Sequence, residues 1–372
     1  MFRDARHRGI AIQLGLLIAI FIAAALLVST AVSNLETRGI PVGIDFLGMP
    51  SEIVISESVL AHDPGDSHYR SILVGIANTL FVSTLVIILS TVCGLVIGLA
   101  RLSENPLASI TSKCWVELAR NFPPIVILIF LYSIWWKVFP PVDQAWELLP
   151  GTYLSMRGLN CPEIALSFSP VGALGVVIGL VVWALHRRLA ARIRLAPRFW
   201  KLLSIGLLVG GVVLADTHLT LEVPQFTGSN YSGGIELSPE LSTILLGLTL
   251  YTTGFIAEII RGGVLSINKG QWEAGRALGL SRGKILRFIV IPQTLRVIVP
   301  PLNSQYINVV KNSTLAIAVG YPDFLAVMNT MISKTSHSIE GVLIILGVYL
   351  VINLSLSTLA NWYNRRVGLT GG

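Results

Sequence analysis

The feature that most constrains this chain is a series of long apolar runs separated by short charged segments. A hydrocarbon core of about 30 Å needs about 20 apolar residues in a helix that rises 1.5 Å per residue. Eight runs reach or approach that length, at residues 11–32, 72–100, 115–136, 171–185, 202–215, 241–260, 297–319 and 342–362. We therefore predict an all-α integral membrane protein with about eight transmembrane helices.

The composition agrees with this interpretation. Only 13% of the 372 residues are charged and 53% are hydrophobic, whereas soluble chains carry about 25% charge. A free-standing soluble enzyme, a disordered chain and a disulfide scaffold are excluded. The three cysteines (Cys93, Cys114 and Cys161) lie far apart without metal-ligand spacing, so we interpret them as structural.

Three of the runs leave alternatives open. Arg3, Arg6 and Arg8 precede the first run, as they would in a signal peptide. The run of about 20 residues is longer than a usual signal-peptide core, which favours a retained helix. The runs at 171–185 and 202–215 are short, and either form an inserted helical hairpin or lie partly at the interface.

The basic residues predict the orientation. With both ends placed inside, 20 of the 27 Lys and Arg residues fall in cytoplasmic segments and five in outer loops. Cytoplasmic loops of membrane proteins are enriched in Lys and Arg, so we expect cytoplasmic termini. The net charge of +7 is explained by topology, and a nucleic-acid partner is not expected.

The cytoplasmic loop at 261–295 is long and patterned. Asn268 or the Lys269-Gly270 pair can open a short helix, and Gly279 can close it. Ala274, Ala277 and Leu278 would then share one helix face. Such a helix either lies on the membrane surface or docks in a groove of a cytoplasmic partner. Composition alone does not choose between these two interpretations.

The spacing in this loop resembles the EAA loop of ABC importer permeases, E-A-A-x3-G-x9-I-x-L-P. Five residues match in register: Glu273, Ala274, Gly279, Ile289 and Pro292. Gly275 stands where the family has a second alanine and Ile291 where it has leucine, and we expect both replacements to be mild. The resemblance implies that this loop forms the coupling helix, which in the family sits in a groove of the ATPase subunit.

Further segments resemble the polar amino-acid branch of these permeases, the histidine/glutamate/aspartate type. They are GIANTL at 75–80, GLARLS at 98–103, ELARNFP at 117–123, Tyr251, Ala257-Glu258, Arg261-Gly262-Gly263, Pro292-Gln293 and KNSTLA at 311–316. The resemblance covers about 71–136 and 237–363. The additional first helix, outer loop and insertion resemble the Q-type subunit of general L-amino-acid permeases.

This resemblance implies a type I ABC importer permease core with an N-terminal extra helix and an inserted helical hairpin. Residues 1–70 would hold the tail, the first helix and a periplasmic loop, and 71–363 the transmembrane domain with an insertion at 140–236. The implied function is an ATP-driven permease subunit for polar or general L-amino acids in the bacterial inner membrane. The implied partners are ABC ATPase subunits, a second permease in a heterodimer, a periplasmic amino-acid-binding protein and the lipid bilayer.

Charges within the apolar runs call for a reason, because burying one in a bilayer is costly. They either pair structurally near the membrane surface or line a substrate path, where a zwitterionic amino acid needs partners of both signs. Pro123-Pro124 and Pro300-Pro301 either kink the packing or open such a path. The candidate path residues are Glu117, Arg120, Asn121, Glu258, Lys311, Asn312, Ser313 and Thr314.

No phosphate-binding loop, nucleophile elbow or zinc spacing occurs in a suitable context. We therefore expect a transport subunit that is not itself an enzyme and binds no cofactor or metal, with ATP used by a partner. The alternative is an ion-coupled secondary amino-acid transporter, in which Glu117, Glu258 and Lys311 carry protons or ions. A membrane enzyme or a non-transporting scaffold fits less well, because no catalytic constellation is present.

Overall fold

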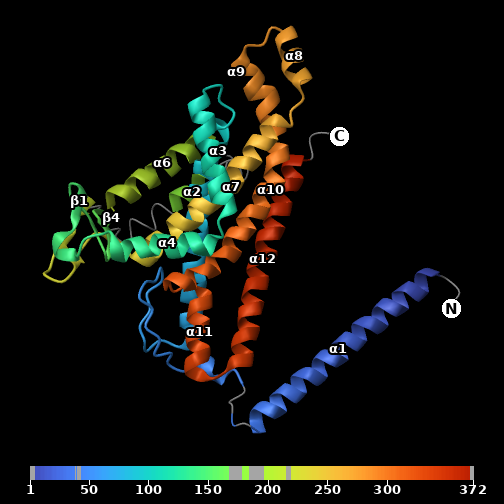
Figure 1. Ribbon diagram of the computed structural model, residues 1–372, viewed down its shortest axis with the longest axis vertical. Helices are drawn as coiled ribbons and strands as arrows, with labels where there is room; N and C mark the ends of the chain where they lie inside the picture. Colours follow the sequence, from blue (N-terminus) through green and yellow to red (C-terminus); the bar gives the residue numbers. More distant parts are fainter. Residues whose placement is uncertain are drawn as a thin grey trace. The chain divides into compact units, whose positions relative to one another are not determined.

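The computed structural model describes residues 5–37, 39, 43–166, 178–183, 197–214 and 219–368. The chain divides into two compact units (Figure 1). Residues 1–131 and 243–372 form the first, which we call the helical unit, and residues 132–242 form the second, the inserted unit.

The helical unit is built from helices and short helical turns. In chain order these are α1 (Ala5–Thr37), η1 (Asp45–Gly48), α2 (His68–Ala100), α3 (Pro106–Asn121), the first part of α4 (Pro124–Lys137), most of α7 (Pro239–Leu265), α8 (Lys269–Ala277), α9 (Arg282–Ile285), the π-helical turn η3 (Leu286–Val290), α10 (Ile291–Asn312), the 3-10 helix η4 (Ser313–Val319), α11 (Phe324–Thr335) and α12 (Ser338–Gly368). Within this unit, α8 and α9 lie at one end and α11 at the other (Figure 1).

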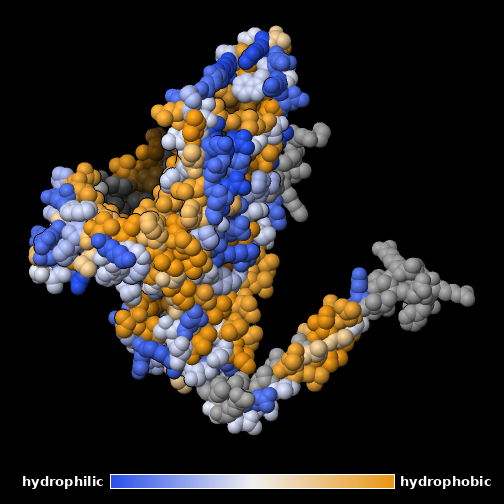
Figure 2. All heavy atoms as spheres, viewed as in Figure 1, coloured by the Kyte–Doolittle hydropathy of each residue, from blue (hydrophilic) through white to orange (hydrophobic). Residues whose placement is uncertain are grey.

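Long apolar helices confirm the membrane-protein prediction. Among the described residues, four helical segments are long and apolar enough to cross a membrane: α2, α7, the segment from Arg282 to Val319, and α12 as far as Trp362. The bent pair α3 and α4 adds a fifth if it counts as one span. Apolar side chains are exposed along α1 and over much of the helical unit, and hydrophilic ones gather at the α8 end and in a band along the middle of the helical unit (Figure 2).

The total of eight spans stays a prediction. The run at 11–32 lies within α1, and the run at 202–215 corresponds to α6 (Pro197–Leu214), an 18-residue helix. The run at 171–185 falls outside the described residues except for 178–183, which are helical. The run at 115–136 does not form one straight helix, because α3 and α4 meet at a bend of 103°.

The two proline pairs have different effects. Pro124 begins α4 directly after the break that separates it from α3, as expected for a residue that lacks a backbone N–H. Pro300 and Pro301 instead lie inside α10, which continues through them from Ile291 to Asn312. The helix is therefore continuous through the second pair.

Helix α2 crosses α7 at two glycines one turn apart. A Cβ atom at Gly94 would lie 2.5 Å from Cγ2 of Ile256, and one at Gly98 would lie 2.8 Å from the carbonyl oxygen of Ala257. Small residues spaced by four let membrane helices approach backbone to backbone. The G-x-x-x-G spacing at 94–98 thus holds α2 against α7 within one chain.

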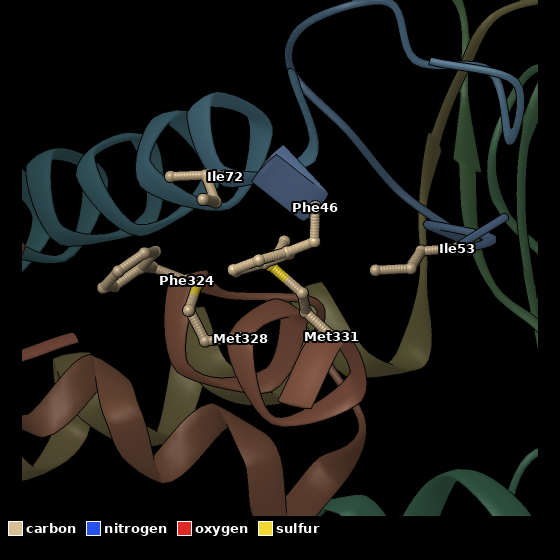
Figure 3. Close-up of a cluster of buried hydrophobic side chains, with 6 residues drawn as sticks. All are labelled: Phe46, Ile53, Ile72, Phe324, Met328 and Met331. Atoms are coloured by element: carbon tan, nitrogen blue, oxygen red, sulfur yellow. The ribbon is translucent and has the colours of Figure 1, made fainter. Parts of the chain in front are cut away.

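An irregular segment, residues 43–67, packs onto the α11 end of the helical unit. We call it the strap. Its side chains Phe46 and Ile53 are buried together with Ile72 of α2 and with Phe324, Met328 and Met331 of α11 (Figure 3). The ring of Phe46 also stacks on His337, with centroids 4.3 Å apart. This cluster holds in one place a long segment whose regular structure is limited to the turn η1 and a bridge between Pro50 and Ser67.

The inserted unit contains strands that we did not predict. They are β1 (Trp146–Leu149), β2 (Thr152–Ser155), β3 (Gly158–Cys161), β4 (Glu163–Leu166), β5 (Leu219–Glu222), β6 (Gln225–Phe226), β7 (Tyr231–Ser232) and β8 (Ile235–Leu237), with the short helical turn η2 at Val142–Gln144. They form an antiparallel sheet in the order β1-β2-β3-β8 and two two-stranded sheets, β4-β5 and β6-β7. Strands of two to four residues are too short for an alternating pattern to be visible in sequence. The insertion is therefore a mixed unit rather than a helical hairpin alone.

Candidate coupling segment and substrate path

Helix α8 begins and ends where the sequence predicts. The side chain of Asn268 accepts a hydrogen bond of 2.9 Å from the backbone N–H of Gly270, which caps the helix. At the other end Gly279 adopts φ = +71°. The N–H groups of Gly279 and Leu280 donate to the carbonyls of Arg276 and Gly275 at 2.9 and 3.1 Å. This is the Schellman pattern, in which glycine supplies the left-handed residue.

Gly275 has a specific packing role. A Cβ at this position would lie 2.8 Å from Cγ1 of Ile285 and 3.3 Å from Cδ1 of Ile289. Ile285 is only 1% exposed, so it has little freedom to move away. The replacement of alanine by glycine, which we expected to be mild, is instead matched to the close packing of α8 against α9 and η3.

The opposite face of α8 is exposed in this chain. Glu273, Ala274, Arg276 and Ala277 are exposed, and Leu278 has 77% of its surface accessible. The side chains of Gln271 and Gln293 are joined by a hydrogen bond of 3.2 Å. That bond connects α8 to the start of α10, beside Pro292. Helix α8 is thus attached to α10 on one side, and its exposed face carries two alanines, a leucine and charged side chains.

Near the end of α7, Glu258 binds two arginines. Its carboxylate accepts hydrogen bonds of 2.6 and 3.2 Å from Nη2 and Nε of Arg261. It also accepts one from Nη1 of Arg101, at the end of α2. The Arg101 side chain is only 13% exposed. The expected spacing of Glu258 and Arg261 is realised as an ion pair, and Arg101 is the partner that sequence spacing did not reveal.

The other predicted pair is arranged differently. Glu117 lies 3.8 Å from Nζ of Lys113, and the two side chains are 59% and 60% exposed. The guanidinium of Arg120 lies over the ring of Phe255 in α7, 5.5 Å from its centroid. Asn121 is exposed at the end of α3. Glu117 and Arg120 therefore have separate partners instead of forming the pair suggested by their spacing.

Lys311 and its polar neighbours lie at the junction of α10 and η4. Lys311 is exposed, Asn312 and Thr314 are half-buried, and Ser313 is buried. The hydroxyls of Ser313 and Thr314 donate at 2.8 Å to the backbone carbonyls of Val310 and Lys311. Within the described residues, no hydrogen bond or ion pair joins these four to Glu117 or Glu258. The path candidates thus occupy three separate places.

A buried polar junction that was not predicted from the sequence lies where α2 meets the start of α11. The amide of Asn78 donates at 2.9 Å to the carbonyls of Glu57 and Pro322. Its oxygen accepts at 3.0 Å from the backbone N–H of Val59. One fully buried side chain therefore ties α2 to the strap and to the turn before α11. The segment GIANTL contained Asn78, but its position in an apolar run was the only available signal.

Asp323 caps α11 at the same junction. Its Oδ1 accepts at 2.8 Å from the N–H of Ala326, while its buried Oδ2 has no partner in the described structure. Burial raises the pKa of this carboxyl to about 6, although hydrogen bonds from Ala326 and Leu325 act in the opposite direction. An aspartate directly before an apolar run is a helix-start signal and could have predicted α11.

Comparisons with known proteins agree with this arrangement. Residues 197–369 match the family of binding-protein-dependent transport system inner membrane components. The putative amino-acid ABC transporter permease protein YhdX of Escherichia coli (strain K12) is 38% identical, across 91% of this chain and 88% of its own length. The general L-amino acid transport system permease protein AapQ of Rhizobium johnstonii is 36% identical, across 98% and 94%.

A third relative has a similar extent. The glutamate/glutamine/aspartate/asparagine transport system permease protein BztB of Rhodobacter capsulatus is 32% identical, across 98% of this chain and 95% of its own. A crystal structure of an amino acid ABC transporter with histidines shares the fold, with a TM-score of 0.50 and 19% identity over 80% of this chain and 95% of that chain. The chain belongs to the family of binding-protein-dependent transport system inner membrane components, the permease subunits of ABC transporters.

Proposed function

We propose that this chain is a permease subunit of an ATP-driven importer for polar or general L-amino acids. The observation that carries the proposal is α8, a capped helix whose exposed face holds Glu273, Ala274 and Leu278. A short helix whose exposed face combines apolar and charged side chains is suited to docking in a groove of another protein. The substrate class is supported by relatives whose names specify amino-acid transport.

In the proposed mechanism, separate ATPase subunits bind and hydrolyse ATP, and α8 carries their movement to the membrane helices. A second permease completes the translocation path, and a periplasmic binding protein delivers the amino acid. The chain itself binds no cofactor. The excess of Lys and Arg on the α8 side supports cytoplasmic termini in a bacterial inner membrane. Lys311, Asn312, Ser313 and Thr314 are the proposed contacts to the path, because Lys311 is exposed in an apolar span.

Co-purification from membranes with the co-expressed ATPase and partner subunits tests the proposal. We expect an ATPase subunit to remain bound to the wild-type chain. Glu273→Lys reverses an exposed charge, and Gly279→Pro removes the left-handed residue that closes α8. Each change should reduce ATP-driven uptake at least tenfold while the chain still inserts in the membrane.

Gly283→Ala is a matched control in the same segment, because a Cβ at Gly283 meets no atom within 4 Å. Normal uptake in the Glu273 and Gly279 variants would contradict coupling through α8. Uptake by the chain alone in vesicles, driven by an ion gradient without ATP, would support a secondary transporter instead.

A further inference from the structure

The end of α2 is attached to the end of α7 by charge and by close packing. Arg101 follows the last turn of α2, and its backbone N–H still donates to the carbonyl of Ile97 at 3.0 Å. Its side chain binds Glu258, which Arg261 also holds. One turn earlier, Gly98 touches the α7 backbone at Ala257. Charge-assisted hydrogen bonds between largely buried groups are the strong ones, so the two helix ends are fixed to each other.

The connection from α7 to α8 is short and hydrogen-bonded, because α7 ends at Leu265 and α8 begins at Lys269. The N–H of Ser266 donates to the carbonyl of Gly262 at 3.0 Å, and that of Ile267 donates to Val264 at 3.4 Å. Asn268 follows directly as the cap of α8. Helix α8 is therefore joined through a short hydrogen-bonded turn to the end of α7, where Glu258 binds Arg101.

The other side of the coupling segment also reaches α2. Helix α10 follows α9 and η3 without an intervening loop. The hydroxyls of Tyr306 in α10 and Thr91 in α2 form a hydrogen bond of 3.0 Å. Both helices that flank the α8–α9 segment are thus in direct contact with α2.

The far end of α2 holds the start of α11. The Oγ1 of Thr79 accepts a hydrogen bond of 3.0 Å from the N–H of Phe324, and Thr79 is fully buried. A Cβ at Gly75 would lie 2.9 Å from Cα of Phe324. From Thr79 to Arg101 the helix spans roughly 33 Å at 1.5 Å per residue. One unbroken helix therefore contacts both ends of the helical unit.

From these contacts we propose that α2 carries the movement of the coupling segment to the α11 end, with Arg101 and Thr79 as positioning residues at its two ends. This inference rests on the proposed function of α8. Contiguous packing alone does not show energetic coupling between sites. If α2 carries the movement, loss of the contact at either end interrupts the same step.

The test uses the assembled transporter, with its ATPase subunits and binding protein, in proteoliposomes. Arg101→Gln removes the ion pair between Arg101 and Glu258, which we call the clamp. Thr79→Val removes the hydroxyl group and keeps the volume of the side chain. The readout is amino acid taken up per ATP hydrolysed. We expect each variant to lower this ratio about 3- to 30-fold, the double variant to be no worse than the worse single one, and Arg101→Lys to restore part of the loss.

Lys113→Gln is the matched control, because it removes one positive charge from an exposed pair on α3, and its ratio should equal that of the wild type. Unchanged ratios in both variants, or effects that multiply in the double variant, would overturn the proposal. Loss of the ATPase subunit from the Arg101→Gln complex would also overturn it, because the clamp would then serve assembly. Failure of the proposed function is recognised separately, by a wild-type complex without ATP-driven uptake.

Discussion

Glu258 and Arg261 in α7, and Glu117 and Arg120 in α3, repeat one spacing of acid and arginine in two regions of the helical unit. In α7 the carboxylate is half-buried and binds two guanidinium groups. In α3 the carboxylate is exposed and lies near Lys113, while Arg120 lies over an aromatic ring. The same helical register thus leads to a clamp between helices in one region and to a surface pair in the other.

The difference comes from the neighbouring helix. A spacing of three residues brings two side chains to one helix face and allows an ion pair worth only a few tenths of a kcal/mol. At Glu258 the close approach of α2 at Gly98 brings in Arg101, and the carboxylate side chain is only 28% exposed. At Glu117 the carboxylate remains 59% exposed within the described part of the chain. The value of a charge pair is therefore set by what packs over it.

The largest effect is expected from Gly98→Leu, which removes the close approach that makes the two regions differ. The added side chain meets the carbonyl oxygen of Ala257 and the side chain of Ile260. Overpacking of this kind costs about 1–3 kcal/mol, or more where backbone must move. We expect the yield of folded chain in detergent to fall severalfold by size-exclusion chromatography. Gly206→Leu, at a position with no atom within 4 Å, should give a normal yield.

Glu258→Gln should have the next largest effect. The variant leaves Arg101 and Arg261 near each other without a counter-charge, and removing one partner of a buried pair is destabilising. Because the pair is partly exposed, we expect a loss of about 2 kcal/mol, or about 3 °C in the thermal midpoint of a chain of 372 residues. Tryptophan fluorescence during heating measures it. A midpoint equal to that of the wild type would show that the clamp contributes nothing to stability.

The third carboxyl in this comparison is Asp323, which is buried and is bound by backbone N–H groups. Its pKa of about 6 in the folded chain lies above the ordinary value of 3.8, because burial disfavours the charged form. The folded state therefore binds the proton more tightly, so the free energy of unfolding falls as pH rises from about 4 to about 6 and then levels off. Asp323→Asn keeps the helix cap and should lack this fall.

Thermal midpoints of the wild type and Asp323→Asn, measured between pH 4.5 and pH 7.5, check this prediction. The variant should gain stability relative to the wild type as pH rises. A constant difference across the range would mean that Asp323 does not titrate there. Asp323→Ala removes the cap as well and should be about 1 kcal/mol less stable than Asp323→Asn.

Glu117→Gln should have the smallest effect. Its partner Lys113 is 60% exposed, and exposed ion pairs contribute about 0–1 kcal/mol. We expect a change in thermal midpoint of about 1 °C or less, measured beside Glu258→Gln under the same conditions. An equal loss in the two variants would remove the distinction between the clamp and the surface pair.

Much of the coupling segment was predictable, because its information is local. Asn268 and Gly279 set the ends of α8 through side-chain capping and backbone conformation, which depend on residues a few positions apart. The apolar lengths and the distribution of Lys and Arg along the chain were equally local, and they predicted a membrane-spanning chain with cytoplasmic termini. The strands of the inserted unit were not predictable, because each is too short to carry a pattern. In addition, β3 and β4 pair with β8 and β5, which lie more than 50 residues further along the chain.

The sequence by itself determined the membrane setting, the family and the boundaries of α8, since these follow from hydrophobic length, local capping and motif spacing. Only the tertiary structure decided which charges meet. Arg101 lies 157 residues from Glu258, and no helical period connects them. The close packing of α2 on α7 and of α8 on Ile285 depends on the shape of surfaces brought together by folding, and so it also explains why glycine occupies positions 98 and 275.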